Sequence, residues 1–390
     1  MIGELKIKGR DLKTGKGIAV SVREGRITGI KPTVVTDNFW LSPGLIDLQV
    51  NGYRGLDLNT DTLDVPTVSA LTRELLAAGV TTFAPTLITA SREQLLTRLS
   101  AIAKALELDP IAKACIPFVH VEGPNISPIE GYRGAHPLEH VRPPSIDEFD
   151  QWQKAGNNII GLVTLSPHFA NSTTYIATLV ARGVRVSIGH THATPEQIHE
   201  AVNAGASLST HLGNGIATIL ARHSNPIWSQ LAEDRLYASF ISDGHHLPPE
   251  VLKAMLRAKS LERSILVSDS VALAGMPPGR YHATIGGEVE LSADGRLGMA
   301  GTTILAGAAL PLLDCISAAV RMTGLALASV LEMATANPGD FVGGYGRLQL
   351  NRRADLLQFQ WDETNAKMTV MNVWLAGVSQ SLSPKSIPNY

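Results

Sequence analysis

The 390-residue sequence has little cysteine, no long apolar run and no marked excess of either charge. Its two cysteines, Cys115 and Cys315, exclude a disulfide framework and a cysteine-rich zinc module. No apolar stretch reaches about 18 residues, the length of a membrane span, and the charged N-terminus lacks the apolar region of a secretory signal. A formal charge of −2 gives no reason to expect nucleic acid or a membrane as partner. We therefore expect a cytoplasmic protein.

What the sequence does contain is apolar material for a large core. Apolar residues make up 44% and charged residues 17%, a balance that excludes a disordered chain. At about 150 residues per domain the length allows two or three domains, although an α/β barrel uses more than about 200 residues in one. Twelve histidines outnumber the seven tyrosines and the five tryptophans.

Short β-strands are predicted at both ends of the chain, where apolar or alternating runs are separated by turn residues. The N-terminal runs are Leu5–Lys8, Ile18–Arg23 and Arg26–Ile30, and the C-terminal runs are Ala354–Gln360, Lys367–Val373 and Trp374–Val378. Because chain termini often lie close together, the two sets can pair. We therefore predict a small β domain built from residues 1–42 and 345–390.

Between the two ends, strand-like runs alternate with helical ones, the pattern of parallel α/β folds. The eight strand candidates are Leu45–Val50, Thr81–Thr86, Phe118–Gly123, Ile159–Ser166, Val186–His190, Ser207–Leu212, Tyr237–Asp243 and Ile265–Asp269. The helical candidates include Val65–Ala78, Glu93–Leu106, Thr194–Ala204, Pro249–Ala258, Ala309–Met322 and Val330–Ala336. Residues 43–344 are thus predicted to form a (β/α)₈ barrel, in which Gly275–Leu305 is an inserted hairpin or active-site loop. The alternative, an open doubly wound sheet, lacks a GxGxxG turn after the first strand.

Polar side chains follow seven of the eight predicted strands, at the ends where barrel enzymes carry their catalytic groups. In strand order these residues are Gln49 and Asn51, Glu122, His168, His190 and His192, His211 and Asn214, Asp243 with His245 and His246, and Asp269. Random placement would scatter such residues over helices and strand starts as well. The clustering therefore predicts a polar site at one rim of the barrel.

One glutamate and two histidines of this rim match the ligand set of a catalytic zinc site, which keeps an open position for water. We choose Glu122, His190 and His211, because each follows an apolar strand whose pleat can aim the side chain inward. A single histidine at a strand end is more often a hydrogen-bonded structural residue, so the prediction depends on the three together. Asp269 ends the last strand with no Lys or Arg beside it. Its carboxylate can act as a general base and acid, or simply cap the following turn.

The motifs around these residues resemble the amidohydrolase superfamily of metal-dependent hydrolases and, more narrowly, the N-acetylglucosamine-6-phosphate deacetylase family. The superfamily signature is the run at 42–47 together with Ala-Asp-Leu at 354–356. The narrower matches are PGLIDLQVNG (43–52), AGVTTFAPTLIT (78–89), HVEGPNISPIEGYRGAHP (120–137), VSIGHTHAT (186–194), STHLGN (209–214), SDGHHL (242–247), LVSDS (266–270) and ATANPGDFVG (334–343). They run in collinear order over nearly the whole chain.

The resemblance implies a distorted (β/α)₈ barrel with a small β-sandwich formed by both termini. It implies an enzyme that hydrolyses the amide of N-acetylglucosamine 6-phosphate to glucosamine 6-phosphate and acetate. It also implies one divalent metal ion per subunit, because Gln49 and Asn51 occupy the positions where most members carry the histidines of a second metal. Zn²⁺ is the expected ion, with Fe²⁺, Co²⁺ and Mn²⁺ as alternatives.

The resemblance further assigns roles around the metal. Asp269 would be the general base and acid, and His136 would contact the sugar or the amide carbonyl. Arg222 stands where the family has a phosphate-binding arginine of the partner subunit, which implies a homodimer. The remaining implied substrate contacts are the backbone amides of Asn214 and Gly215 at the phosphate, His246, Thr302 and Thr303.

Several motifs on the sugar and phosphate side depart from the family pattern. The fourth strand ends in Ser-Pro-His168 where the family has Ala-Pro-Glu, and Arg222 precedes His-Ser-Asn-Pro in place of Glu-Pro-Gly. His192 and His245 are additional imidazoles, for which hydrogen bonding at the surface or beside the site is the simplest interpretation. Two alternatives therefore stay open: an amidohydrolase acting on another N-acyl amine, amino sugar epimer or cyclic amide, and a non-catalytic carbohydrate-binding relative.

Overall fold

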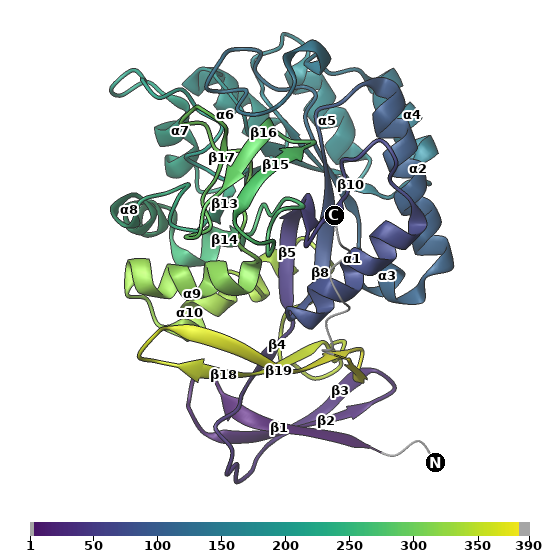
Figure 1. The fold of residues 1–390 in the computed structure, drawn as a ribbon, viewed down its shortest axis with the longest axis vertical. Helices are drawn as coiled ribbons and strands as arrows, with labels where there is room; N and C mark the ends of the chain where they lie inside the picture. Colours follow the sequence, from purple (N-terminus) through teal and green to yellow (C-terminus); the bar gives the residue numbers. More distant parts are fainter. Residues whose placement is uncertain (1–3, 382–390) are drawn as a thin grey trace.

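The computed structural model describes residues 4–381 and contains a barrel with a smaller sheet beneath it (Figure 1). The smaller sheet is formed by segments from opposite ends of the chain that lie side by side. Residues 1–3 and 382–390 of the predicted small domain lie outside the described residues. The division at residues 42 and 345 stays a prediction about where one unit ends and the other begins. Among residues 4–381, none of the helices combines the length and the apolar character that a membrane span requires.

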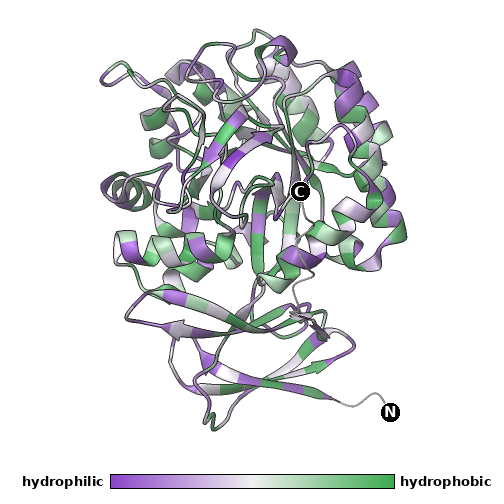
Figure 2. Ribbon diagram, viewed as in Figure 1, coloured by the Kyte–Doolittle hydropathy of each residue, from purple (hydrophilic) through white to green (hydrophobic). Residues whose placement is uncertain are grey.

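Eight parallel strands form the nearly closed barrel, in the order in which they occur along the chain. They are β5 (Leu45–Val50), β8 (Val80–Ile88), β9 (Val119–Glu122), β10 (Ile160–Leu165), β11 (Arg185–Ile188), β12 (Leu208–Ser209), β13 (Tyr237–Ile241) and β14 (Ser264–Val267). All residues of β5 and β8 are buried, as expected for parallel strands covered on both faces. Figure 2 shows the corresponding hydrophobic colouring of these central strands. The predicted barrel is thus confirmed.

Three barrel strands end two or three residues earlier than the sequence predicts. The predicted ends include His190, His211 and Asp269, but β11, β12 and β14 end at Ile188, Ser209 and Val267. The reason is that these three residues have positive φ angles of 47°, 29° and 49°, which take the backbone out of the extended region.

Helices surround the barrel and bury their apolar faces against it. They are α1 (Val65–Ala77), α2 (Arg92–Leu108), α3 (Pro110–Cys115), α4 (Ile146–Ala155), α5 (Ser172–Ala181), α6 (Pro195–Asn203), α7 (Pro226–Ala232), α8 (Pro249–Lys259), α9 (Leu312–Thr323), α10 (Leu327–Glu332) and α11 (Ala336–Gly339), with 3₁₀ turns η1 (Leu138–His140) and η2 (Leu261–Arg263). The helix predicted over Val330–Ala336 is wrong in its bounds. It straddles α10 and α11, because Thr335 leaves the helical region at φ −138° and ψ −80°.

The terminal sheet joins both ends of the chain in the order β20-β19-β18-β4-β1-β2-β3. Its strands are β1 (Leu5–Asp11), β2 (Gly17–Arg23), β3 (Arg26–Pro32), β4 (Trp40–Pro43), β18 (Leu356–Asp362), β19 (Lys367–Leu375) and β20 (Val378–Gln380). The sheet folds over a small core of its own, with β18 and β19 above β1–β3 in Figure 1. The predicted break between Val373 and Trp374 is wrong. The chain turns instead at Ala376 and Gly377, both of which have positive φ.

The predicted insertion at Gly275–Leu305 is a three-stranded antiparallel sheet at the mouth of the barrel. Its strands are β15 (Gly279–Ala283), β16 (Gly287–Leu291) and β17 (Leu297–Met299). A short hairpin, β6 (Gly52–Tyr53) with β7 (Leu56–Asp57), follows the first barrel strand. Both pieces lie after carboxyl ends of barrel strands, where the polar residues collect.

Candidate active site

A cavity of about 400 Å³ opens at the carboxyl ends of the barrel strands. Its lining includes most of the residues predicted from the sequence, namely Asn51, Glu122, His136, His190, His211, Asn214, Gly215, His246, Asp269 and Thr303. The insertion contributes an apolar wall through Ile285, Met299 and Ile304. The prediction of a polar site at this rim thus corresponds to a real concavity with one apolar side.

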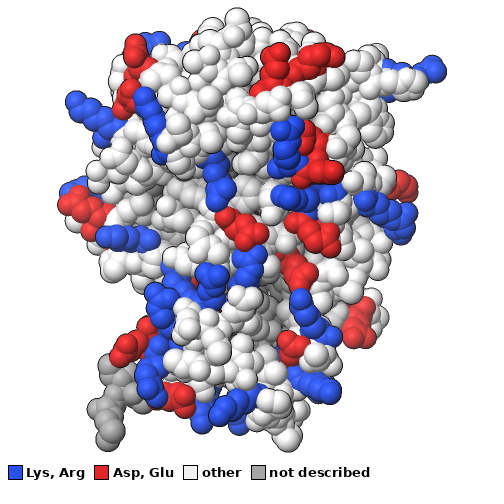
Figure 3. Space-filling model, turned by 180° about the vertical axis from the view of Figure 1, so that it is seen from behind, with Lys and Arg blue, Asp and Glu red and all other residues white. Residues whose placement is uncertain are grey.

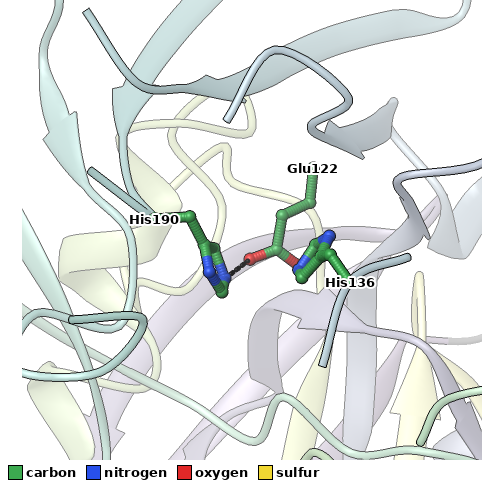
Figure 4. Close-up of side chains that lie close together, drawn as sticks. All are labelled: Glu122, His136 and His190. Carbon is green, nitrogen blue, oxygen red and sulfur yellow. Dashed lines mark ion pairs between the residues drawn. The ribbon is translucent and has the colours of Figure 1, made fainter. Parts of the chain in front are cut away.

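Three potential ligand atoms meet at one point of this cavity. Glu122 Oε1 lies 2.9 Å from His211 Nε2 and 3.2 Å from His190 Nε2, and the two Nε2 atoms are 3.2 Å apart. Figure 4 shows the contact between Glu122 and His190. Ligand atoms of a tetrahedral zinc site with bonds of about 2.0–2.1 Å are separated by about 3.3 Å. The three atoms therefore already have the spacing that a bound metal imposes.

The protonation of His190 supports the same interpretation. Its Nδ1 lies 2.9 Å from the backbone carbonyl of Tyr132, which only accepts, so Nδ1 carries the proton. In the neutral ring, Nε2 then directs a lone pair at the Glu122 carboxylate. A cation between the two groups satisfies both, and a backbone carbonyl on the far nitrogen is a common partner of a metal-binding histidine.

Contacts between the three residues keep the Glu122 carboxylate ionised. Burial raises the pKa of Glu122, but the neighbouring His190 and His211 imidazoles outweigh it and hold that pKa well below its ordinary value. Burial lowers the pKa of His211, but the hydrogen bond and the charge of Glu122 raise it overall. The carboxylate therefore stays ionised, as a metal ligand must be.

A second grouping shares two of these residues. Ligand atoms of Glu122, His136 and His190 lie within 4.8 Å of one another, and Figure 4 shows how the three side chains face each other. The wider spacing makes His136 a weaker candidate for the third ligand than His211. Its Nδ1 lies 2.8 Å from Thr89 Oγ1, and burial lowers the pKa of His136 to about 3. His136 is thus a neutral imidazole beside the metal candidates.

The two carboxamides predicted to replace a second metal site each contact a carboxylate. Gln49 Nε2 donates to Glu122 Oε2 at 3.1 Å, and Asn51 Nδ2 donates to Asp269 Oδ1 at 2.8 Å. Because ionised carboxylates only accept, the amide nitrogens must face them. Gln49 and Asn51 therefore occupy this side of the site with hydrogen-bond donors, which suit carboxylates and not a cation.

Asp269 lines the same cavity as the ligand atoms and is buried. Burial, followed by the negative charge of Glu122, raises the pKa of Asp269 to about 6. A carboxylate with a raised pKa near neutrality has the properties of a general base that can return its proton. The positive φ angle of Asp269, like those of His190 and His211, costs free energy and is typical of functional positions.

The side of the cavity away from the metal candidates carries the predicted substrate contacts. Gly215 has φ +59°, and a Cβ there would lie 2.6 Å from His190 Nδ1, so the position requires glycine. His246 Nδ1 donates to Asp243 Oδ2 at 2.7 Å, which leaves Nε2 for a ligand. Asn214 Nδ2 is buried and has no hydrogen-bond partner among residues 4–381.

Two predicted substrate contacts do not reach the cavity of their own chain. Arg222 is exposed on the loop before α7, and its side chain is not among the described residues that line the cavity. The Thr302 hydroxyl donates to the Met299 carbonyl within its own turn, whereas the neighbouring Thr303 does line the cavity.

The sequence interpretation missed two charged residues of the lining. Glu130 and Arg133 belong to the loop after β9, and Arg133 donates to the His136 carbonyl at 2.5 Å. Both lie within the quoted motif at 120–137, so their position beside His136 was a signal that could have been used. His245, which had no assigned role, donates through Nε2 to the Asp294 carbonyl in the turn after β16.

Comparison with known proteins shows the family to which the chain belongs. The family model described as the amidohydrolase family matches residues 40–379. The chain therefore belongs to the amidohydrolase family.

Within that family, similar proteins are deacetylases of amino sugar phosphates. The chain is 34% identical to an N-acetylglucosamine-6-phosphate deacetylase of Bos taurus over 83% of this chain and 78% of that protein. It is 31% identical to an N-acetylgalactosamine-6-phosphate deacetylase of Shewanella sp. (strain ANA-3) over 92% and 90%. A solved structure from Mycobacterium smegmatis, an N-acetyl-D-glucosamine-6-phosphate deacetylase mutant bound to N-acetyl-D-glucosamine-6-phosphate, superposes with a TM-score of 0.85 at 26% identity and covers 97% of this chain and 99% of that one.

Proposed function

We propose that this protein is a metal-dependent hydrolase that removes the acetyl group from N-acetylglucosamine 6-phosphate, giving glucosamine 6-phosphate and acetate. The observation that carries the proposal is the meeting of Glu122, His190 and His211 within 3.2 Å, in the same cavity as Asp269. The similarity to deacetylases of both sugar phosphates makes the galactosamine epimer the second candidate substrate.

One divalent ion per subunit, Zn²⁺ in our proposal, would be held by Glu122, His190 and His211. When bound, such an ion polarises a carbonyl and lowers the pKa of water. Asp269, whose carboxylate is oriented by Asn51, takes a proton from the attacking water and passes it to the departing amine. His136 is neutral at working pH. If its Nδ1 accepts from Thr89, its Nε2–H is free to donate to the oxyanion, which is the acetamide oxygen after water has added to the carbonyl.

The phosphate would be bound on the opposite side of the cavity. We assign it to the backbone amides of Asn214 and Gly215, with His246 and Thr303 at the sugar and Thr302 in the same loop. Because Arg222 is exposed and outside its own cavity, we propose that it completes the site of a second copy in a homodimer. This arrangement lets a single local cluster of donors bind an anion in a protein with little net charge.

The experiment that tests the proposed function is a substrate series on the metal-loaded protein. Metal per chain is measured first, followed by release of acetate from N-acetylglucosamine 6-phosphate, its galactosamine and mannosamine epimers, and the three unphosphorylated sugars. We expect about one metal ion per chain and the highest kcat/KM with a phosphorylated sugar. Absence of turnover with all six compounds would contradict the proposal.

A further inference from the structure

The imidazoles of His168 and His192 had no assigned role, yet a chain of contacts joins them to the candidate metal ligand His190. Their ring centroids are 4.2 Å apart, and they continue a row of rings from Phe169 at one end to Tyr132 at the other. We call these four side chains the histidine row. The Tyr132–His192 separation of 5.9 Å falls in the range of favourable contacts between aromatic rings, and the other two pairs of rings pack more closely.

Ser127 connects this row to His190. Its backbone N–H donates to the His190 carbonyl at 2.9 Å, and its hydroxyl lies 2.6 Å from His192 Nδ1. Ser127 is fully buried, so its hydrogen bonds are shielded from water. Ser127 therefore contacts the backbone of His190 through its N–H and the side chain of His192 through its hydroxyl.

Thr191, which lies between His190 and His192, is also held by a hydrogen bond from a buried serine, Ser166. Ser166 Oγ donates to Thr191 Oγ1 at 2.7 Å and lies 2.6 Å from His168 Nδ1. Because its proton goes to Thr191, Ser166 accepts from His168, which fixes the proton of His168 on Nδ1. The segment 190–192 is thus anchored at each of its three residues.

Tyr132, at one end of the histidine row, also contacts Nδ1 of His190, the ring nitrogen that does not face Glu122. Tyr132 contacts His192 edge to face at 5.9 Å, and the Tyr132 carbonyl accepts from His190 Nδ1. His190 is in a left-handed conformation, which persists only where the surroundings determine it. The contacts described above supply that determination.

We propose that Ser127, His192 and His168 are positioning residues that orient His190, so that its Nε2 lone pair meets Glu122 and His211. The inference rests on the proposed function, because it assumes that His190 binds the metal. Ser127 bonds to both His190 and His192, and His192 also contacts Tyr132. His168 acts through His192 and Ser166, so its removal has the smaller effect.

The test is the affinity for Zn²⁺ alone, measured by competition with a chromophoric chelator on protein freed of metal. Ser127→Ala and His192→Ala are expected to weaken Zn²⁺ binding about 10–100-fold, the usual effect of removing a partner of a metal ligand. His168→Ala is expected to weaken it less. His199→Ala is the matched control, since His199 is an exposed imidazole on α6 outside the row, and it should bind as the unaltered protein does.

Further variants and measurements distinguish a positioning role from a simple loss of structure. His192→Asn keeps an amide group, which can either donate or accept, near the position of Nδ1 and should recover most of the affinity. The double variant Ser127→Ala/His192→Ala should bind no more weakly than the weaker single variant, because the two groups share one hydrogen bond. The visible absorption of the Co²⁺ forms should change, while melting temperatures of the metal-free variants stay near that of His199→Ala.

The two proposals fail in different ways. If the unaltered protein binds no Zn²⁺, the proposed function fails and this inference fails with it. If the unaltered protein binds Zn²⁺ and both single variants bind it within twofold as tightly, only the inference is overturned. Full additivity in the double variant overturns it as well.

Discussion

Asp269 is held at both its backbone and its side chain. Its N–H donates to the Gln49 carbonyl at 3.0 Å, its Oδ1 accepts from Asn51, and its φ is 49°. The carboxylate is therefore presented to the cavity in one orientation, at the cost of a strained backbone. Asparagine tolerates positive φ better than most residues, so the base can be removed without altering the fold.

The variant Asp269→Asn is therefore expected to lose about 10²–10⁴-fold in kcat while keeping its metal content, because no proposed ligand is changed. Turnover is measured as acetate release and metal by elemental analysis. Asp314→Asn, in α9 and not among the described cavity residues, is the control and should keep its activity. Retained turnover in Asp269→Asn would remove Asp269 from its assigned role.

A second prediction at this scale concerns the glycine beside His190. Gly215→Ala introduces a Cβ 2.6 Å from His190 Nδ1 and should displace the ring and weaken metal binding at least about tenfold. Gly183→Ala is the matched control, since Gly183 also has positive φ (+79°) but open space around it. Both substitutions should cost about 1–2 kcal/mol of stability through the backbone. Equal metal affinity in the two variants would contradict the prediction.

Among the elements, helix α3 shows how a single carboxylate fixes a junction at the base of the barrel. Asp109 precedes α3 and accepts from Ile111 N at 2.9 Å, while its other oxygen accepts from Arg73 of α1 at 2.6 Å. Burial raises the pKa of Asp109, but the hydrogen bonds of Arg73, Ser69 and the backbone lower it overall to about 2. The ordinary value for an unfolded chain is about 3.9.

Because the folded pKa is lower than the unfolded one, Asp109 stabilises the fold above about pH 4, and this contribution disappears as the pH falls towards 2. Asp109→Asn keeps a residue that caps helices well but removes the charge. Its melting temperature should lie below that of the unaltered protein at pH 6 and approach it near pH 2. A constant difference over this range would contradict the assignment of the charge.

The elements also show how far the sequence alone can lead. Glu122, His190, His211 and Asp269 were predictable because the carboxyl ends of parallel strands meet at one rim, whichever helices connect them. The links from Ser127 to His192 and from His190 to Tyr132 were not predictable. They depend on the path of the loop after β9, which follows no residue period and brings together residues 58 and 65 positions apart. Arg133 was missed for the same reason.

At the scale of the whole molecule, the formal net charge is −2, so neither sign of charge dominates. On the face seen in Figure 3, basic residues lie more densely towards the terminal sheet, and acidic residues lie among them without a broad field of one sign. This face therefore offers no broad basic field that would attract an anionic substrate. In the proposed homodimer, Arg222 supplies a cation for such a substrate at the interface between copies.

Mixing two impaired variants tests this arrangement. Arg222→Ala should raise KM for the phosphorylated substrate, and Asp269→Asn should lose most of its kcat. A mixed dimer has one site with both an intact Asp269 and the neighbour's Arg222, so mixing should restore low KM in part of the sites. The unphosphorylated sugar is the control, since its KM should not change. Mixed dimers that form without recovery would contradict a contribution across the interface.

The terminal sheet has a consequence for the order in which the chain is made. Strand β4 is bonded on one side to β1 and on the other to β18, which comes from the far end of the sequence. During synthesis the edge of β4 therefore stays open until the whole barrel has been produced. Open strand edges are templates for association between chains. The last strands of this protein thus cover the edge that its first strands leave open. A chain truncated before β18 is expected to aggregate through β4 even with a complete barrel.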